Sequence, residues 1–272
     1  MPELPEVEVI RQDLSQEIDK NSAIKKFIFY RKDIREPIPI KKITTLEGAT
    51  IKAISRRAKY LIFETSKGYL ISHLGMSGNW RIVDSLKLKN VKHDHVEIHL
   101  NNGKCFVYND PRRFGIFGFS ENLEKNKKLK ELGPEPWSSE FSTSHLREMF
   151  KKTNRSIKVA VMDPKVVVGV GNIYASEILF AIGIKPTKKS QRLTLDELEK
   201  LIQMIRQILT EAIQRGGSSI KTFQKANGQS GSFQNSHKVY GRMGDACFVC
   251  HEKIRKIVIA GRSSFWCPGC QR

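Results

Sequence analysis

The first six residues of this 272-residue chain, MPELPE, place a proline directly after the initiator methionine and two carboxylates close behind it. Removal of Met1 would leave Pro2 with a free secondary amine, and an α-amino group titrates near ~8, so part of it is unprotonated at neutral pH. A helix is expected to follow at once, because apolar residues recur with a helical period from Val7 to Ile18. The positive end of that helix would lower the pKa of the amine further. Pro2 is therefore a candidate nucleophile, although proline and glutamate are also common at ordinary helix starts.

Four cysteines near the C-terminus have the spacing of a metal site. Cys247 and Cys250 form one C-x-x-C pair and Cys267 and Cys270 form a second, with sixteen residues between the inner cysteines. Two such pairs suit one tetrahedral structural zinc, and disulfides are the alternative. The intervening segment carries the basic residues Lys253, Arg255, Lys256 and Arg262. The zinc would therefore hold a basic hairpin that is suited to phosphate groups.

The charge balance indicates a polyanionic partner. The chain has 47 Lys and Arg against 28 Asp and Glu, a net charge of +19. Nucleic acid is favoured over a membrane surface, because the basic residues are spread along the chain and neither terminus carries a lipidation motif. No apolar run is long enough to span a bilayer and no signal-like segment begins the chain, so we expect a soluble, cytosolic protein.

The pattern along the chain predicts two structural regions. Residues 51–119 alternate in hydrophobicity as strands do, with hairpins expected at 60–73 and 95–108. A charged stretch at 121–140, broken by Gly and Pro at 133–136, is the expected linker. Beyond it the period is helical.

The clearest predicted helix begins with Thr194 and Glu197 as a capping box and ends at Gly216-Gly217. A glycine turn at 168–171 leads into another helix, which Asn172 is expected to cap. Backbone N–H groups at such a start can bind a phosphate, and an ordinary capped helix is the alternative. A dinucleotide fold is disfavoured, because no strand precedes the glycines and no acidic residue follows at the required distance.

Taken in order, these segments and several further tags resemble bacterial formamidopyrimidine-DNA glycosylases over the whole chain. The tags are PELPE at 2–6, RRAKY at 56–60, HLGM at 73–76, KHDH at 92–95, DPRRFG at 110–115, the glycine turn, VYGR at 239–242 and the zinc cysteines. The resemblance implies an α+β fold in three parts. These are an N-terminal β-sandwich opened by a helix (1–133), a helix-two-turns-helix DNA-binding domain with a lesion loop (134–237) and a zinc ribbon (238–272).

The resemblance also implies an activity: removal of 8-oxoguanine and formamidopyrimidines from double-stranded DNA, followed by β- and δ-elimination at the abasic site. It implies that Pro2 attacks the sugar and forms an imine, and that Glu3 acts as general acid. Lys59 matches the acid of β-elimination and Arg262 the arginine assigned to δ-elimination. One structural zinc is the only cofactor implied, and the family suggests a monomer in the bacterial cytosol, associated with the nucleoid.

Further residues match DNA-contacting positions of the family. Met76, Arg112 and Phe114 would fill the space left by a flipped base, with core packing as the alternative for Met76 and Phe114. The residues that match backbone contacts are His93, Asn172 and Tyr240. Lys221 begins the loop that covers the flipped base in this family.

Several alternatives accompany this interpretation. His93 and His95 could instead form a second metal site, and Cys105 is expected to be buried and inert. The chain departs from the family at Asn154, where a lysine is common, and at 236–238, where Ser-His-Lys replaces Glu-Leu-Gln. The rival functions are an endonuclease VIII-type glycosylase for oxidised pyrimidines and a non-catalytic zinc DNA-binding protein.

Overall fold

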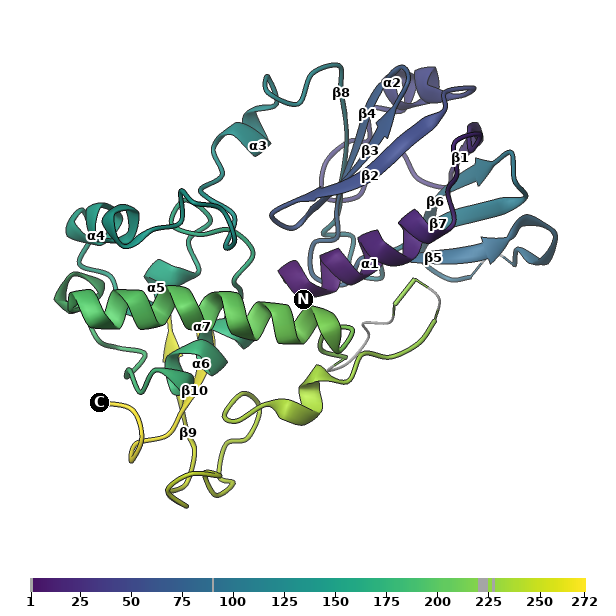
Figure 1. Ribbon diagram of the computed structural model, residues 1–272. Coiled ribbons are helices and arrows are strands. Elements are labelled where there is room, and N and C mark those ends of the chain that lie inside the picture. Colours follow the sequence, from purple (N-terminus) through teal and green to yellow (C-terminus); the bar gives the residue numbers. More distant parts are fainter. Residues whose placement is uncertain (1, 90, 220–224, 227) are drawn as a thin grey trace. The chain divides into compact units, whose positions relative to one another are not determined.

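The computed structural model describes residues 2–89, 91–219, 225–226 and 228–272 (Figure 1). These residues form two compact units. Unit 1 comprises Met1–Lys130 and Arg215–Ser232, and unit 2 comprises Glu131–Gln214 and Phe233–Arg272. The division into three parts at 133 and 237 stays a prediction. Within the described ranges, no helix combines the length and the apolar character that a membrane crossing requires.

Unit 1 contains a helix, α1 (Leu4–Gln16), and two antiparallel sheets. The first sheet has the order β1 (Ile24–Phe29), β6 (Asp94–Leu100), β7 (Lys104–Asn109), β5 (Asn79–Asp84). The second sheet has the order β2 (Ile51–Arg57), β3 (Tyr60–Thr65), β4 (Gly68–His73), β8 (Ile116–Ser120). The short helices of this unit are α2 (Ile40–Ile43), η1 (Thr44–Leu46), η2 (Ser85–Lys87) and α3 (Lys127–Lys130). Both predicted hairpins, β3–β4 and β6–β7, are confirmed.

The core of unit 1 lies between the two sheets. Trp80 of the first sheet contacts Phe63 and Phe117 of the second, with ring centroids 5.4 and 5.6 Å apart. Such aromatic pairs contribute about 0.5–1.5 kcal/mol beyond the burial of their area. The apolar face of α1 joins the same core, as its helical period predicts. The predicted N-terminal β-sandwich is therefore confirmed.

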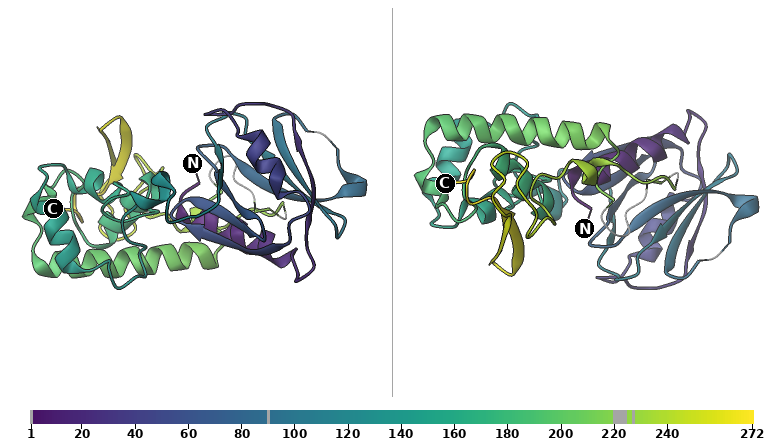
Figure 2. Two further views of the ribbon diagram at one scale, coloured as in Figure 1. Left: turned by 90° about the horizontal axis from the view of Figure 1, so that it is seen from above. Right: turned by 90° about the horizontal axis from the view of Figure 1, so that it is seen from below.

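Unit 2 is helical and carries a two-stranded hairpin, which extends from the helices in Figure 2. Its elements are α4 (Thr143–Lys151), α5 (Ile157–Val161), α6 (Asn172–Ala181), η3 (Ser190–Arg192), α7 (Leu195–Gln214), η4 (Phe233–Ser236), β9 (Arg255–Ile259) and β10 (Arg262–Trp266). Helix α6 is almost entirely buried, so it lies at the centre of the unit. Helix α7 begins with the predicted capping box: the N–H of Thr194 donates to Glu197 and the N–H of Glu197 donates to the Thr194 hydroxyl.

Candidate active site

The start of α1 fixes the position of Pro2. Glu3 is the N-cap and forms a capping box with Glu6: the Glu3 N–H donates to the Glu6 carboxylate at 2.7 Å, and the Glu3 side chain accepts from the N–H of Glu6. Both glutamates are 1% exposed. Pro2 is also buried and precedes this box directly, so its nitrogen belongs to the positive end of the helix.

Glu6 has a second partner, far along the chain, that the sequence did not predict. The N–H of Ser218 donates to the Glu6 carboxylate at 2.8 Å. The preceding residue, Gly217, has φ +76°, and a Cβ on it would lie 3.0 Å from a Glu6 oxygen. The Gly216-Gly217 pair therefore does more than end α7, because it allows close approach of the backbone to Glu6. The only sequence signal for this contact was the glycine pair itself.

Lys59 lies in the two-residue turn between β2 and β3, after Ala58, which has φ +53°. The Arg56 guanidinium fastens this turn to α1, since it donates to the Ala58 carbonyl at 2.9 Å and to the Glu8 carboxylate at 3.0 Å. Burial, and then the charge of Lys59, lower the pKa of His73 to about 4. Arg56 therefore attaches the turn of Lys59 to the helix that follows Pro2, and the ring of the next residue, Tyr60, lies 4.7 Å from the His73 ring.

Two exposed apolar side chains stand on loops of unit 1. Met76 is 40% exposed and Phe114 is 39% exposed, which excludes the core-packing alternative for both. The Arg112 guanidinium lies 4.9 Å from the centre of the Phe114 ring, within cation–π range. At Gly75, with φ +62°, a Cβ would lie 2.3 Å from the Phe114 backbone, so only glycine lets the two loops approach this closely.

Asp110 ties these loops together and is fully buried. Its carboxylate accepts from the Ser77 hydroxyl and from the N–H of Gly115 at 2.8 Å. The N–H of Asp110 donates to the His93 carbonyl, and a ring nitrogen of His95 lies 2.9 Å from the Asp110 carbonyl. His93 has φ +76° and precedes β6, so it does not share a strand face with His95 as the metal-site alternative required. Among the described residues, neither cluster of potential metal ligands contains these histidines.

Hydrogen bonds within unit 2 join α6 to the β9–β10 hairpin and to residues 238–240. The prediction that Asn172 caps α6 was wrong: the N-cap is Gly171, and the Asn172 amide donates instead to the Ser263 carbonyl at 2.9 Å. Asn172 lies in the first turn of α6, from which its side-chain amide can reach the neighbouring strand β10. It therefore bonds that strand instead of capping the helix. Ser263 follows Arg262, which is exposed at the start of β10.

Glu177 anchors the residues that include Tyr240. Glu177 is 4% exposed, and its carboxylate accepts from the N–H groups of Lys238, Val239 and Tyr240 at 2.7, 3.0 and 2.7 Å. Burial raises the pKa of Glu177, and the three donors oppose that effect. His237, one of the residues at which the chain departs from the family pattern, contacts the Tyr240 ring at 5.8 Å between centroids. Tyr240 in turn contacts Phe265 of the ribbon at 5.1 Å.

The four cysteines predicted to bind zinc converge. Their sulfur atoms all lie within 4.8 Å of one another, with Cys250 and Cys267 3.3 Å apart and Cys247 and Cys270 3.8 Å apart. Four thiolates at about 2.3 Å from one zinc are roughly 3.8 Å apart, so the cluster fits the ion. A Cβ on Gly269 would lie 2.8 Å from the Cys250 sulfur, which explains glycine in this knuckle. All four are free thiols rather than disulfides.

Two further residues singled out in the sequence are Cys105 and Lys221. Cys105 is buried, as predicted, and burial raises its pKa to about 12. Lys221 lies outside the described residues.

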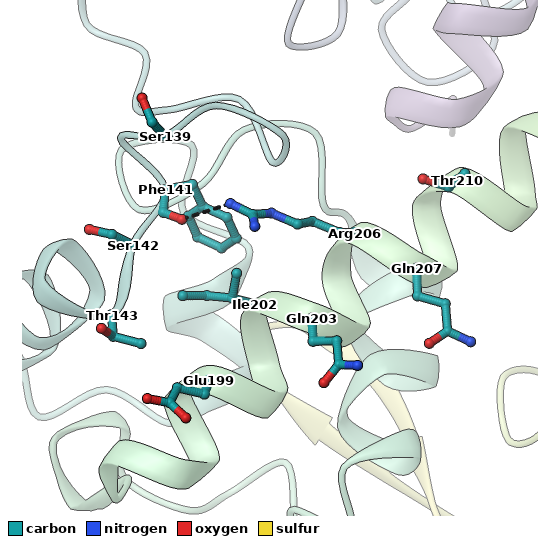
Figure 3. A pocket seen from close by; sticks show the side chains of 10 residues that line it. All are labelled: Ser139, Phe141, Ser142, Thr143, Glu199, Ile202, Gln203, Arg206, Gln207 and Thr210. Atoms are coloured by element: carbon teal, nitrogen blue, oxygen red, sulfur yellow. Dashed lines mark hydrogen bonds between the residues drawn. The ribbon is translucent and has the colours of Figure 1, made fainter.

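A groove of about 750 Å³ in unit 2, between α7 and residues 139–143, contains none of the predicted site residues (Figure 3). There the Arg206 guanidinium donates to the Phe141 carbonyl at 3.1 Å.

Known proteins similar to this chain match it from end to end. The profile of the formamidopyrimidine-DNA glycosylase N-terminal domain matches residues 1–117, and that of the formamidopyrimidine-DNA glycosylase H2TH domain matches 132–224. A formamidopyrimidine-DNA glycosylase of Bdellovibrio bacteriovorus is 47% identical over 272 residues, which is 100% of both chains. The chain belongs to the formamidopyrimidine-DNA glycosylase family. A member from Legionella pneumophila (strain Lens) is 42% identical, covering 100% of this chain and 98% of its own.

Solved structures of formamidopyrimidine-DNA glycosylases agree with the fold. A Lactococcus lactis variant in complex with DNA containing Fapy-dG matches with a TM-score of 0.92 and 35% identity over 100% of both chains. The Lactococcus lactis enzyme in complex with abasic-site DNA matches with a TM-score of 0.91 and 36% identity over 99% of both. The helical part of unit 2 is thus the helix-two-turns-helix region of the family.

Proposed function

We propose that this chain removes oxidised purines from duplex DNA and cleaves the strand, with Pro2 as the nucleophile. The start of α1 carries the proposal, since a capping box of two buried carboxyl groups fixes the residue that would bear the free amine. The family membership supports it, because relatives have been solved with Fapy-dG and with abasic-site DNA. The net charge of +19 favours binding of duplex DNA.

The first proposed step requires a Pro2 nitrogen freed of Met1. Its lone pair forms a bond to the sugar C1′ while the bond from C1′ to the damaged base breaks, and the base leaves with that electron pair and takes up a proton. Glu3, next to Pro2, would donate a proton to the sugar ring oxygen as the ring opens. The result is an iminium between Pro2 and C1′, which acidifies the neighbouring C2′ proton.

Strand cleavage then follows by two eliminations. Loss of the C2′ proton forms a C2′–C3′ double bond and expels the 3′ phosphate, loss of the C4′ proton then breaks the C5′–O bond and expels the 5′ phosphate, and water releases Pro2 from C1′. We assign proton donation in the first elimination to Lys59 and the second step to Arg262. Because a guanidinium keeps its proton at neutral pH, we expect Arg262 to act by holding the departing phosphate.

We propose that Met76, Arg112 and Phe114 enter the duplex where the damaged base has left it. Their exposure and the close packing of the two loops that carry Met76 and Phe114 support this role, because an apolar wedge must keep its shape while bases unstack. The proposed contacts to the DNA backbone and to the flipped base come from His93, Asn172, Tyr240 and Lys221. The bonds that join Asn172 of α6 to β10 and Glu177 of the same helix to residue 240 support a single phosphate-binding surface in unit 2.

We further propose that Cys247, Cys250, Cys267 and Cys270 hold one structural zinc. Four protein sulfurs leave no open position for a substrate, so the ion would stabilise the fold of the hairpin that carries Arg262. We also propose the three domains divided at 133 and 237, a monomeric enzyme, and a location in the bacterial cytosol with the nucleoid.

Borohydride trapping tests the nucleophile. The protein is incubated in borohydride with duplex DNA carrying one 8-oxoguanine opposite cytosine, and the adduct is mapped by peptide mass. We expect the adduct on Pro2. The variant Pro5→Ala is the matched control, since it removes a proline of the same segment that never carries a free amine, and it should still be trapped.

Two other results would change the proposal. No adduct, from protein with Met1 removed and zinc bound, would contradict the purine-lyase assignment. An adduct with an oxidised pyrimidine alone would favour the endonuclease VIII-type alternative, and this arm is needed because a Lactococcus lactis relative has been solved with DNA containing an oxidised pyrimidine. Binding without an adduct on either DNA would favour the non-catalytic alternative.

A further inference from the structure

Three side chains with metal-binding chemistry meet on the first sheet of unit 1. Glu97 and His99 are two residues apart on β6, so they point to the same face of the sheet. Cys105 of β7 pairs directly with His99 in the register of the two strands. The alternate residues Val96, Ile98 and Phe106 belong to the hydrophobic core. The three polar side chains therefore lie on the sheet face opposite to the core.

The potential ligand atoms are already close together. One oxygen of Glu97, a ring nitrogen of His99 and the sulfur of Cys105 all lie within 4.8 Å of one another, and the His99 Nε2 and a Glu97 oxygen are 2.7 Å apart, at hydrogen-bond distance. Ligands at about 2.0–2.3 Å from a tetrahedral zinc are roughly 3.3–3.8 Å apart, so side-chain shifts of about 1 Å would complete the shell. The second Glu97 oxygen accepts from the Tyr30 hydroxyl at 2.7 Å, which orients the carboxylate.

Burial and access both suit a bound cation. Glu97 is 1% exposed and Cys105 is fully buried, so the carboxylate is held in a poorly solvated place. The His99 side chain retains 12% exposure and lines a surface pocket of about 710 Å³, whose charged lining residues are Lys25, Lys26, Asp84 and Lys104. The pocket gives an ion a route from solvent to the exposed part of the His99 side chain. Arg81, on the neighbouring strand β5, is paired with Asp94 at 2.6 Å, which offsets its charge.

We propose that Glu97, His99 and Cys105 bind a divalent cation of the zinc type, in a site separate from the four-cysteine cluster. A donor set of carboxylate, imidazole and thiolate favours zinc over magnesium or calcium, which prefer oxygen ligands alone. Three protein ligands leave the fourth tetrahedral position to a water molecule from the pocket. Because all three ligands stand on paired strands, the ion would fasten β6 to β7.

Metal stoichiometry tests this site. The full chain is reduced, saturated with zinc, freed of loosely bound ion and analysed by mass spectrometry for zinc per chain. We expect two zinc ions in the wild type and one in His99→Gln and in Cys105→Val, which keeps an apolar side chain of similar size in the strand. His145→Gln is the matched control: its ring bonds the Val166 carbonyl in unit 2, and the variant should keep two.

Cobalt provides a second readout that misfolding would not mimic. Cobalt is added to protein that already holds one zinc in the cysteine cluster, and we expect an additional absorption band from a site with one thiolate ligand. Cys105→Val should lack that band. It should keep the circular dichroism spectrum of the wild type, which shows that it is folded. One zinc per chain in the reduced wild type would overturn the proposal. Two zinc ions in both site variants would overturn it as well, because the second ion would then have other ligands.

Discussion

The anchor that Glu177 provides for residues 238–240 can be broken by one substitution. In Glu177→Ala three backbone N–H groups lose their acceptor. The bond from Val239 is fully buried and the bonds from Lys238 and Tyr240 are partly buried, so water replaces them poorly. An unsatisfied buried donor costs about 1–3 kcal/mol and a partly buried one less, so the loss of all three acceptors should destabilise this region by roughly 4 kcal/mol. Glu177→Gln can keep the oxygen that accepts from both Val239 and Tyr240 and loses only the acceptor of Lys238, so it should cost much less.

Amide hydrogen exchange measures this loss at the affected residues. A local destabilisation of about 4 kcal/mol should speed exchange at residues 239 and 240 by about a thousandfold. The control is Glu148→Ala, which removes an exposed carboxylate paired with Lys152 and should change exchange less than threefold. If exchange in Glu177→Ala stays within fivefold of the wild type, the three bonds do not fix this segment, and the reasoning fails.

Three further outcomes are expected. Burial lowers the pKa of His73 and of His237 to about 4. Between about pH 6.5 and pH 4 these two rings are therefore protonated in the unfolded chain but neutral in the folded chain. Urea titrations should show full stability above pH 6.5 and a loss of up to about 3 kcal/mol per ring as pH falls to 4, reduced in His237→Phe. Gly75→Ala should lower the melting temperature and weaken lesion binding, because its Cβ meets the Phe114 backbone; unchanged melting would contradict this. Chelation of zinc should unfold the ribbon, which circular dichroism would detect, and weaken DNA binding, which fluorescence anisotropy would detect. Loss of zinc without either change would refute a structural role.

Local patterns were sufficient where the stabilising contacts are local. The hairpins at 60–73 and 95–108 follow from alternating residues around turns, and the start of α7 follows from Thr194 and Glu197, which bond each other three residues apart. The sequence did not predict β1, because a register shift between Ile24 and Lys26 interrupts the alternation that marks a strand. The cysteine spacing predicted a cluster that the structure confirms, since each pair lies within a single turn.

The sequence alone determined the family, the fold class and the candidate nucleophile, because the tags that carry them are short and contiguous. Only the tertiary structure decided which partners fix those residues. Glu6 meets Ser218, 212 positions away, and Glu177 meets residues 238–240. It also assigned the Asn172 amide to a ribbon strand instead of a cap, and it gathered Glu97, His99 and Cys105 on one sheet face. Hydrogen bonds over such separations depend on how whole elements pack, and no local period in the sequence records that packing.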